Sequence, residues 1–427
     1  MRILIIAYGF APSSVIGAVR PTKFAKYLSL FGHDVTVLCS KKCFGAKDED
    51  SMIGLEKIKI CRVGDSTETN IGKRAAKRRK NLIYRFLKKI YYSFIWPMSY
   101  YRNSYNSYME MRNYYMDNLK NSSFDIIIST FPDLSNVFLA NYLKRKFHFN
   151  TVLDLRDNMT DPRYPLSVNL FNRRYQKHSI EESARTFIVS KSATAKLKSE
   201  NPLYSSRINT LYNGYDDNYG SSMEVSDTSP ALRIAYTGAM YSGLRDATPL
   251  FHAIRKLIDE CGYEFQIDYA GQDIEILKEQ ASKFELANIV SDYGIVNMKE
   301  AEQIQKNADL FLVLTWNTKK EQGVLSGKFY EGIKCNKPIL AIVKGELINS
   351  ELYKLNEEYH YGYCYEVERN NSEEGLYDYL RICCQEKQKY GCLKRNQSSE
   401  LAKKFHYRNL TKELERQLYE IMKEKRP

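Results

Sequence analysis

One short stretch of the chain places a cation and a carboxylate where they could bind a phosphate and sugar hydroxyls. Lys328 follows Ser326 and Gly327, and Glu331 comes three residues after Lys328. Because apolar runs flank the stretch, it predicts a loop that turns into a helix at the end of a strand. A helix start offers free N–H groups and a positive dipole end to a phosphate, and residues three apart share one helix face. Lys328 and Gly327 are therefore candidates to bind a diphosphate and Glu331 to bind ribose; the alternative is an ordinary αβ unit with an exposed Lys and Glu.

The hydrophobic pattern on either side predicts the strands and helices that would position this stretch. The first forty residues alternate as a strand at 2–7, a loop at 8–17, a helix at 20–31 and a strand at 33–38, which is typical of parallel strands joined by a right-handed crossover. Further strand runs are found at 125–129, 151–155, 186–189, 232–236, 264–269, 289–293, 309–314, 338–342 and 363–367. The predicted fold class is α/β, with two Rossmann-like doubly wound domains that face a cleft and bind ligands at the carboxyl ends of their strands.

The length of the chain also indicates two domains, because 427 residues exceed one typical hydrophobic core. We expect an N-terminal domain at 1–205, a C-terminal domain at 206–400 and a final helix at 401–427 that returns to the N-terminal domain. An insertion at about 70–115 interrupts the N-terminal domain.

Charge, cysteine usage and missing motifs exclude several classes of protein. The net charge of +13 predicts an anionic partner. Nine cysteines without C-x-x-C pairs or His/Cys clusters indicate reduced thiols rather than disulfides or a zinc site. No signal peptide and no apolar run of about 18 residues is present, so we expect a cytoplasmic protein. Because no G-x-G-x-x-G follows either opening strand, we expect no nicotinamide or flavin cofactor; Walker and H-E-x-x-H motifs are missing as well.

The insertion is strongly basic and rich in aromatic residues. From 69 to 109 the chain has ten Lys and Arg residues and no acidic residue. An amphipathic helix is predicted at 82–96, ending at Trp96 and Pro97. Its polar face carries Arg85, Lys88 and Lys89. Such a helix can lie in the interface of an anionic membrane, where Trp96 would also contact lipid or a lipid-linked ligand. The alternatives are packing on its own domain and RNA binding; no RNA-binding motif accompanies it, so nucleic acid is not an expected partner.

Five stretches of the chain carry a likeness to one enzyme family. They are the opening strand-helix-strand with Gly32-His33-Asp34-Val35-Thr36-Val37, the strand end Asp154-Leu155-Arg156-Asp157, the turn Asn213-Gly214-Tyr215-Asp216, the loop from Tyr236 to Gly243 and the helix from Lys328. In this order, over nearly the whole chain, they resemble GT-B fold glycosyltransferases, specifically the retaining, family-4-like enzymes.

The resemblance implies that the C-terminal domain binds a nucleotide-sugar donor without a metal ion. The negative charge on the departing diphosphate would then be met by Lys328, by the helix start at Gly327 and by Arg245. The alternative for Arg245 is an ordinary surface arginine. Gly238 would belong to the donor loop, and Glu331 would accept hydrogen bonds from the ribose.

On the acceptor side, the resemblance points to three residues of the N-terminal domain. Gly17 would let the backbone approach the donor diphosphate without a Cβ, with turn geometry as the alternative. Arg20 would meet an anionic acceptor or a phosphate. Asp133 would act near the acceptor hydroxyl, with a helix N-cap as its alternative. The nearby charged group, either catalytic or a buried network, is Asp154, Arg156 and Asp157.

The chain departs from the family pattern at one position. Many such enzymes carry two glutamates eight positions apart, the first of which touches the sugar. The residue eight positions before Glu331 is Gly323, and Glu321 lies nearby but out of register. The resemblance therefore does not extend to the carboxylate that contacts the sugar.

The implied function is retaining transfer of a hexosyl or N-acetylhexosaminyl unit from a nucleoside-diphosphate sugar, UDP being favoured over GDP. The acceptor would be polyprenyl-diphosphate-linked or an oligosaccharide, in capsule, O-antigen or exopolysaccharide synthesis. The enzyme would lie peripherally on the inner face of the cell membrane. Two alternatives stay open: a sugar-nucleotide epimerase of the same fold, and a non-catalytic, glycosyltransferase-like partner.

Overall fold

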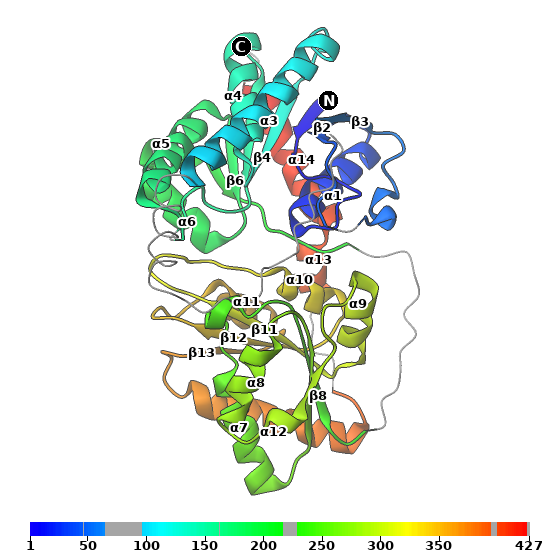
Figure 1. The fold of residues 1–427 in the computed structure, drawn as a ribbon, viewed down its shortest axis with the longest axis vertical. Helices are drawn as coiled ribbons and strands as arrows, with labels where there is room; N and C mark the ends of the chain where they lie inside the picture. The colour runs from blue at the N-terminus through cyan, green and yellow to red at the C-terminus, as the bar shows by residue number, and fades with distance from the viewer. Residues whose placement is uncertain (46, 65–95, 162, 217–228, 394–398, 425–427) are drawn as a thin grey trace. The chain divides into compact units, whose positions relative to one another are not determined.

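Two parallel β-sheets organise the chain (Figure 1). The computed structural model describes residues 1–45, 47–64, 96–161, 163–216, 229–393 and 399–424. The chain divides into two units: unit 1 comprises Met1–Val189, Thr194–Asn213 and Tyr407–Pro427, and unit 2 comprises Ser190–Ala193 and Gly214–His406.

The sheet of unit 1 has seven parallel strands in the order β3-β2-β1-β4-β5-β6-β7. Their apolar runs are buried on both faces, as expected for a parallel sheet covered by helices. The strands are β1 (Arg2–Ile6), β2 (Asp34–Ser40), β3 (Lys59–Val63), β4 (Ile126–Phe131), β5 (Asn150–Leu155), β6 (Arg185–Ile188) and β7 (Ile208–Thr210). In register, Ile3 of β1 lies between Val35 and Ile126.

Helices cover both faces of this sheet (Figure 1). On one face, α1 (Ile16–Leu30) packs against α14 (Tyr407–Glu424), where the rings of Phe24 and Tyr407 lie 5.9 Å apart. The other face carries α3 (Trp96–Asn118), α4 (Leu134–Phe147) and α5 (Leu166–Glu182). The remaining helical segments are η1 (Glu49–Met52), α6 (Lys191–Glu200) and η3 (Pro202–Arg207).

The structure corrects one sequence prediction in the basic insertion. Trp96 and Pro97 are themselves helical residues of α3, so the prediction that they end a helix is wrong. The tyrosine-rich stretch that follows them is this long helix. The predicted membrane contacts Arg85, Lys88 and Lys89 lie outside the described residues.

The sheet of unit 2 has six parallel strands in the order β10-β9-β8-β11-β12-β13. They are β8 (Leu232–Thr237), β9 (Phe265–Ala270), β10 (Val290–Asp292), β11 (Leu310–Trp316), β12 (Ile339–Lys344) and β13 (Gly362–Glu366). One face is covered by α7 (Thr248–Cys261), α8 (Ile274–Ser282) and α12 (Ser372–Tyr390). The other carries α9 (Met298–Asn307) and α10 (Gly327–Lys334), which pack against Ala235 and Phe311 respectively. The smaller helices are η4 (Tyr241–Gly243), η5 (Ala287–Ile289), α11 (Glu351–Tyr359) and α13 (Ser399–Phe405).

A buried arginine ties three parts of unit 1 together. Arg20 of α1 is 1% exposed and makes a bidentate bond to Asp154 at the end of β5, with a shortest distance of 2.7 Å. Its other N–H groups donate to the carbonyl oxygens of Leu211 and Tyr212 and to Asn213, just after β7. All five N–H donors of the guanidinium are therefore used. This corrects the prediction that Arg20 meets an anionic acceptor, because no donor is left to offer.

A second arginine completes the first turns of α1. Pro21 lies inside this helix and has no N–H to donate to the carbonyl of Gly17, four residues earlier. Nη1 of Arg156 donates to that carbonyl instead, and its Nε donates to the carbonyl of Phe131 at 2.9 Å. A Cβ on Gly17 would lie 3.2 Å from Nη1 of Arg156, so glycine permits this close approach. The helix consequently begins at Ile16, within the predicted loop.

Removing the carboxylate partner of Arg20 tests the importance of this contact. Asp154→Ala leaves a buried cation uncompensated, so we expect the free energy of unfolding of unit 1 to fall by about 3–5 kcal/mol. Calorimetry that resolves the two units measures the loss. The matched control is Glu413→Ala, which breaks an exposed pair with Arg416 on α14 and should cost less than about 1 kcal/mol. Equal losses in the two variants would contradict the assignment.

Candidate functional site

The helix α10 positions the two residues that the sequence singled out first. Phe329 and Ile333 are buried, and the ring of Phe329 lies 5.6 Å from that of Phe405. Gly332 lets the helix approach the sheet, because a Cβ there would lie 2.9 Å from Ile339. Because these residues pack one face of α10 against its surroundings, the opposite side stays partly exposed. It carries Lys328 and, one turn later, Glu331.

Lys328 and Glu331 form an ion pair on that exposed side. Nζ of Lys328 lies 2.9 and 2.7 Å from the two carboxylate oxygens of Glu331. Nε2 of the buried Gln305 donates to Glu331 and to Thr237, both at 2.7 Å. Glu331 is thus oriented by an amide from α9. No local sequence pattern pointed to Gln305, since only the fold brings α9 beside α10.

Gly238 brings a second cation to Lys328. Its φ is +144°, and a Cβ would lie 3.3 Å from Cε of Lys328 and 3.8 Å from Nη1 of Arg245. The structure therefore brings Gly238, Arg245 and Lys328 together, as the resemblance implied. Arg245 is buried, so it is not an ordinary surface arginine; it stacks on the ring of Tyr241 at 4.5 Å and donates to the carbonyl of Ala239 at 2.8 Å.

Two buried tyrosines hold the loop that contains Gly238. The hydroxyl of Tyr269 donates to the carbonyl of Gly238 and that of Tyr236 to the carbonyl of Ala239, both at 2.9 Å. Burial raises the pKa of Tyr236 to about 12, so this phenol stays a donor at neutral pH. Asp273 accepts from the N–H of Met240 at 2.8 Å. These framework residues were not identified from the sequence.

Two buried polar atoms at this place have no hydrogen-bond partner among the described residues. They are Nε of Arg245 and Oγ of Ser326. Ser326 occupies the N-cap position of α10, but its side chain makes no capping bond. Buried polar groups are nearly always paired, so these two atoms are exceptions near the cations. Lys328 and the N–H groups of α10 form a site able to bind an anion such as a diphosphate.

Gly323, eight positions before Glu331, has no room for a side chain. Gly323 has a left-handed φ of +72°, and a Cβ would lie 2.3 Å from Oγ of Ser190 and 3.0 Å from the backbone nitrogen of Ala193. The neighbouring Glu321 accepts a 3.0 Å hydrogen bond from the indole of Trp316. Among these residues, Glu331 is the carboxylate beside the two cations.

The carboxyl edge of the unit 1 sheet holds the remaining predicted residues. Asp133 accepts from the backbone N–H of Ser135 at 2.9 Å and from its hydroxyl, which makes it the N-cap of α4. Poor solvation raises the pKa of Asp133 despite these two bonds. Its catalytic role stays a prediction. Trp96 stacks on Tyr100 at 5.2 Å and lies 5.3 Å from Tyr164, an aromatic cluster that the sequence did not predict.

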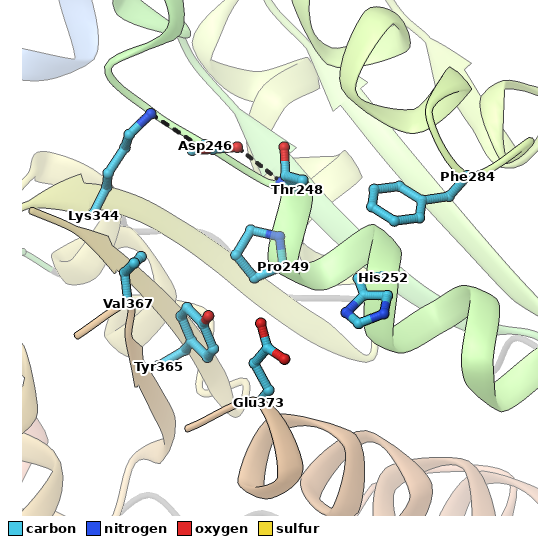
Figure 2. Close-up of a pocket in the computed structure, with 9 residues that line it drawn as sticks. All are labelled: Asp246, Thr248, Pro249, His252, Phe284, Lys344, Tyr365, Val367 and Glu373. Carbon is cyan, nitrogen blue, oxygen red and sulfur yellow. Dashed lines mark hydrogen bonds and ion pairs between the residues drawn. The ribbon is translucent and has the colours of Figure 1, made fainter. Parts of the chain in front are cut away.

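A separate pocket of unit 2, of about 440 Å³, contains none of the predicted site residues (Figure 2). It lies between the N-terminal turns of α7 and α12, at the ends of β12 and β13. It is lined by Asp246, Thr248, Pro249, His252, Phe284, Lys344, Tyr365, Val367 and Glu373. Lys344 is already paired with Asp246 at 3.1 Å, and Glu373 adds a second negative charge. This pocket therefore lacks the free positive charge that a diphosphate requires.

The described residues also bear on metal and membrane binding. Within them, no group of three or more His, Cys, Asp or Glu residues is placed to hold a metal ion. No helix among them is both long enough and apolar enough to cross a bilayer. A reaction that needs no metal stays a prediction.

Comparison with known proteins identifies the fold. No family model and no curated sequence matches the chain. HepE of Anabaena, solved in complex with UDP, matches with a TM-score of 0.59 at 12% identity, over 98% of this chain and 100% of that one. WaaB, a lipopolysaccharide outer core galactosyltransferase in its apo form, matches with a TM-score of 0.56 at 13% identity, over 98% of this chain and 99% of that one. The UDP-GlcNAc 2-epimerase of Methanocaldococcus jannaschii matches with a TM-score of 0.51 at 12% identity, over 98% of this chain and 99% of that one. The predicted fold class, GT-B, is confirmed; at these identities the likeness establishes the fold alone.

Two glycines of unit 2 offer a matched test of the packing at Gly323. Gly262 has a similar φ of +68° but open space around it, whereas Gly323 is enclosed. We expect Gly262→Ala to cost about 1 kcal/mol through backbone strain alone. Gly323→Ala should cost clearly more, and Gly323→Glu more again, because both also displace residues 190–193. Thermal unfolding measures the three values, and equal costs for the two alanine variants would contradict the contact.

Proposed function

We propose that the chain is a retaining glycosyltransferase that moves a hexosyl or N-acetylhexosaminyl unit from a UDP-sugar to a lipid-linked or oligosaccharide acceptor. Unit 2 binds the donor and unit 1 binds the acceptor, without a metal ion. The reaction belongs to surface-polysaccharide synthesis, such as capsule, O-antigen or exopolysaccharide. The protein acts in the cytoplasm, peripherally on the inner face of the cell membrane.

The convergence of two cations and a helix start on Gly238 carries this proposal. Lys328 and Arg245 both approach Gly238, and the unpartnered atoms of Arg245 and Ser326 lie buried in the same region. A nucleoside diphosphate brings the negative charge that the two cations and the N–H groups of α10 complement. The complex of HepE with UDP, which has the same fold, supports UDP as the nucleotide.

The same groups supply what the transfer reaction needs. Breaking the bond between sugar and diphosphate leaves negative charge on the departing phosphate oxygen. Lys328 and the N–H dipoles of α10 stabilise that charge more as it grows, which lowers the barrier. The N–H groups of α10 are held by the packing of the helix before the donor arrives, so they need little reorganisation during the reaction.

Glu331 has two successive partners in this scheme. Without donor, it neutralises Lys328. When the diphosphate takes Lys328, the carboxylate becomes available to the ribose hydroxyls, while Gln305 keeps it in place. Donor binding thus exchanges one ion pair for another and adds hydrogen bonds to the sugar of the nucleotide.

A sugar-nucleotide epimerase is the second candidate, because an enzyme of this class shares the fold. Incubation with a UDP-sugar alone separates the two functions. An epimerase converts part of the sample into a second UDP-sugar without acceptor, whereas a transferase releases UDP only when an acceptor is present. Binding of UDP with neither reaction, across a panel of acceptors, would favour the non-catalytic partner.

Nucleotide binding provides the first test. UDP at a hundred times its dissociation constant should stabilise the protein by about 2.7 kcal/mol, seen as a rise in melting temperature. Lys328→Ala should weaken UDP binding about tenfold or more, because a charge-assisted bond to phosphate is lost. The control Lys283→Ala removes an exposed cation on another side of unit 2 and should leave binding unchanged. Unaltered binding in Lys328→Ala would contradict the proposed site.

Glu331 gives a second test, in which two ligands respond differently. Glu331→Ala removes the ribose acceptor but also frees Lys328 from its ion pair. We therefore expect UDP binding to weaken, while inorganic pyrophosphate binds as well as before or better. The ratio of UDP to pyrophosphate affinity, measured by calorimetry, should fall about tenfold or more. A parallel loss for both ligands would instead show a general disruption of the helix.

A further inference from the structure

The first turns of α3 and α5 form one continuous surface of unit 1. The hydroxyl of Tyr101 donates to the carbonyl of Val168 at 3.3 Å and to Asn172 at 3.2 Å. The rings of Tyr101 and Phe171 lie 4.6 Å apart. These contacts fix the two helices side by side, as Figure 1 shows for α3 in cyan and α5 in green.

Large apolar side chains project from this surface into solvent. Met98 of α3 and Leu166 of α5 are each 75% exposed, and Leu170 is 52% exposed. Tyr105 and Phe171 are also exposed. We call these five residues the docking surface. Exposed apolar groups that gather on adjacent helices mark a contact with a partner.

Unpaired positive charge surrounds the docking surface. The exposed residues Arg102, Arg173, Arg174 and Lys177 lie on the same two helices, and none makes an ion pair with a described residue. No acidic residue occurs at 96–109 or at 163–180. A negatively charged partner therefore complements this face.

We propose that the docking surface binds an anionic lipid bilayer. Apolar and aromatic side chains at the helix starts enter the interface, while the four cations of α3 and α5 meet the phosphate headgroups. This combination of an apolar tip and a basic flank suits interfacial binding, in which hydrophobic and electrostatic contributions add. A protein partner or a second copy of the chain would not require the consistent positive charge.

The location gives the binding a purpose, in a step that rests on the proposed function. Both α4 and α5 begin at the carboxyl edge of the unit 1 sheet, where Asp133, Trp96 and Tyr164 lie. A bilayer against the docking surface holds this edge at the headgroup level. An acceptor carried on a lipid could then reach unit 1 without leaving the membrane.

Vesicle binding tests the proposal directly, without donor or acceptor. The wild-type chain should co-sediment with phosphatidylglycerol-containing vesicles, much less with pure phosphatidylcholine, and less as salt rises. Two double variants should each lower the partition coefficient about tenfold or more. One combines Leu166→Ser with Leu170→Ser, and the other combines Arg173→Glu with Arg174→Glu. The matched control is Leu203→Ser with Arg207→Glu, which changes another exposed leucine and arginine of unit 1 and should bind normally.

Fluorescence gives a second readout that does not depend on these variants. The chain has two tryptophans, so Trp316→Phe leaves Trp96 at the edge of the docking surface as the sole emitter. Brominated lipids in the anionic vesicles should quench it. Any of four outcomes would overturn the proposal. Two of them are a wild type that does not bind vesicles and full vesicle binding by both surface variants. The other two are a Trp96 that lipid fails to quench and dimerisation through this surface in place of lipid binding. Loss of UDP binding with intact vesicle binding would refute the proposed function and leave the docking surface standing.

Discussion

A single buried guanidinium determines how unit 1 is put together. Arg20 connects a helix, the end of a central strand and the segment through which the chain leaves the sheet, and each of its N–H groups has a partner. Burying such a charge is costly unless every partner is in place. None of the three elements can therefore shift alone. The same edge receives Arg156, which supplies the hydrogen bond that Pro21 cannot make, so two arginines, one on α1 and one just after β5, brace the helix above the sheet.

Unit 2 reaches a comparable rigidity with neutral groups. Phenol hydroxyls of Tyr236 and Tyr269 bind the carbonyls of the glycine loop, and the amide of Gln305 holds Glu331. These groups carry no charge of their own, so they fix the geometry and leave the charge balance to Lys328 and Glu331, which pair with each other. The groups around this ion pair therefore serve to keep it in position.

The sequence was sufficient for the fold and for locating Lys328 beside Glu331, but not for the partners of each residue. Apolar runs predicted the strands because parallel strands are buried on both faces. Lys328 and Glu331 were visible because they are close in sequence. Arg20 was misassigned, since its partners lie 134 and more positions away. The start of α1 was missed because Gly17 and the residues before it suggest a loop, and the hydrogen bond from Arg156 to the carbonyl of Gly17 has no local sequence signal. Gln305 gave no local signal at all.

The enclosed position of Gly323 makes two separate segments of unit 2 depend on each other. Residues 190–193 pack over a position that has no Cβ and a left-handed backbone. Any side chain added there meets Ser190 and the backbone of Ala193, so it fits only if that segment moves as well. A substitution at Gly323 alone is therefore obstructed, and sequence changes in the two segments have to occur together.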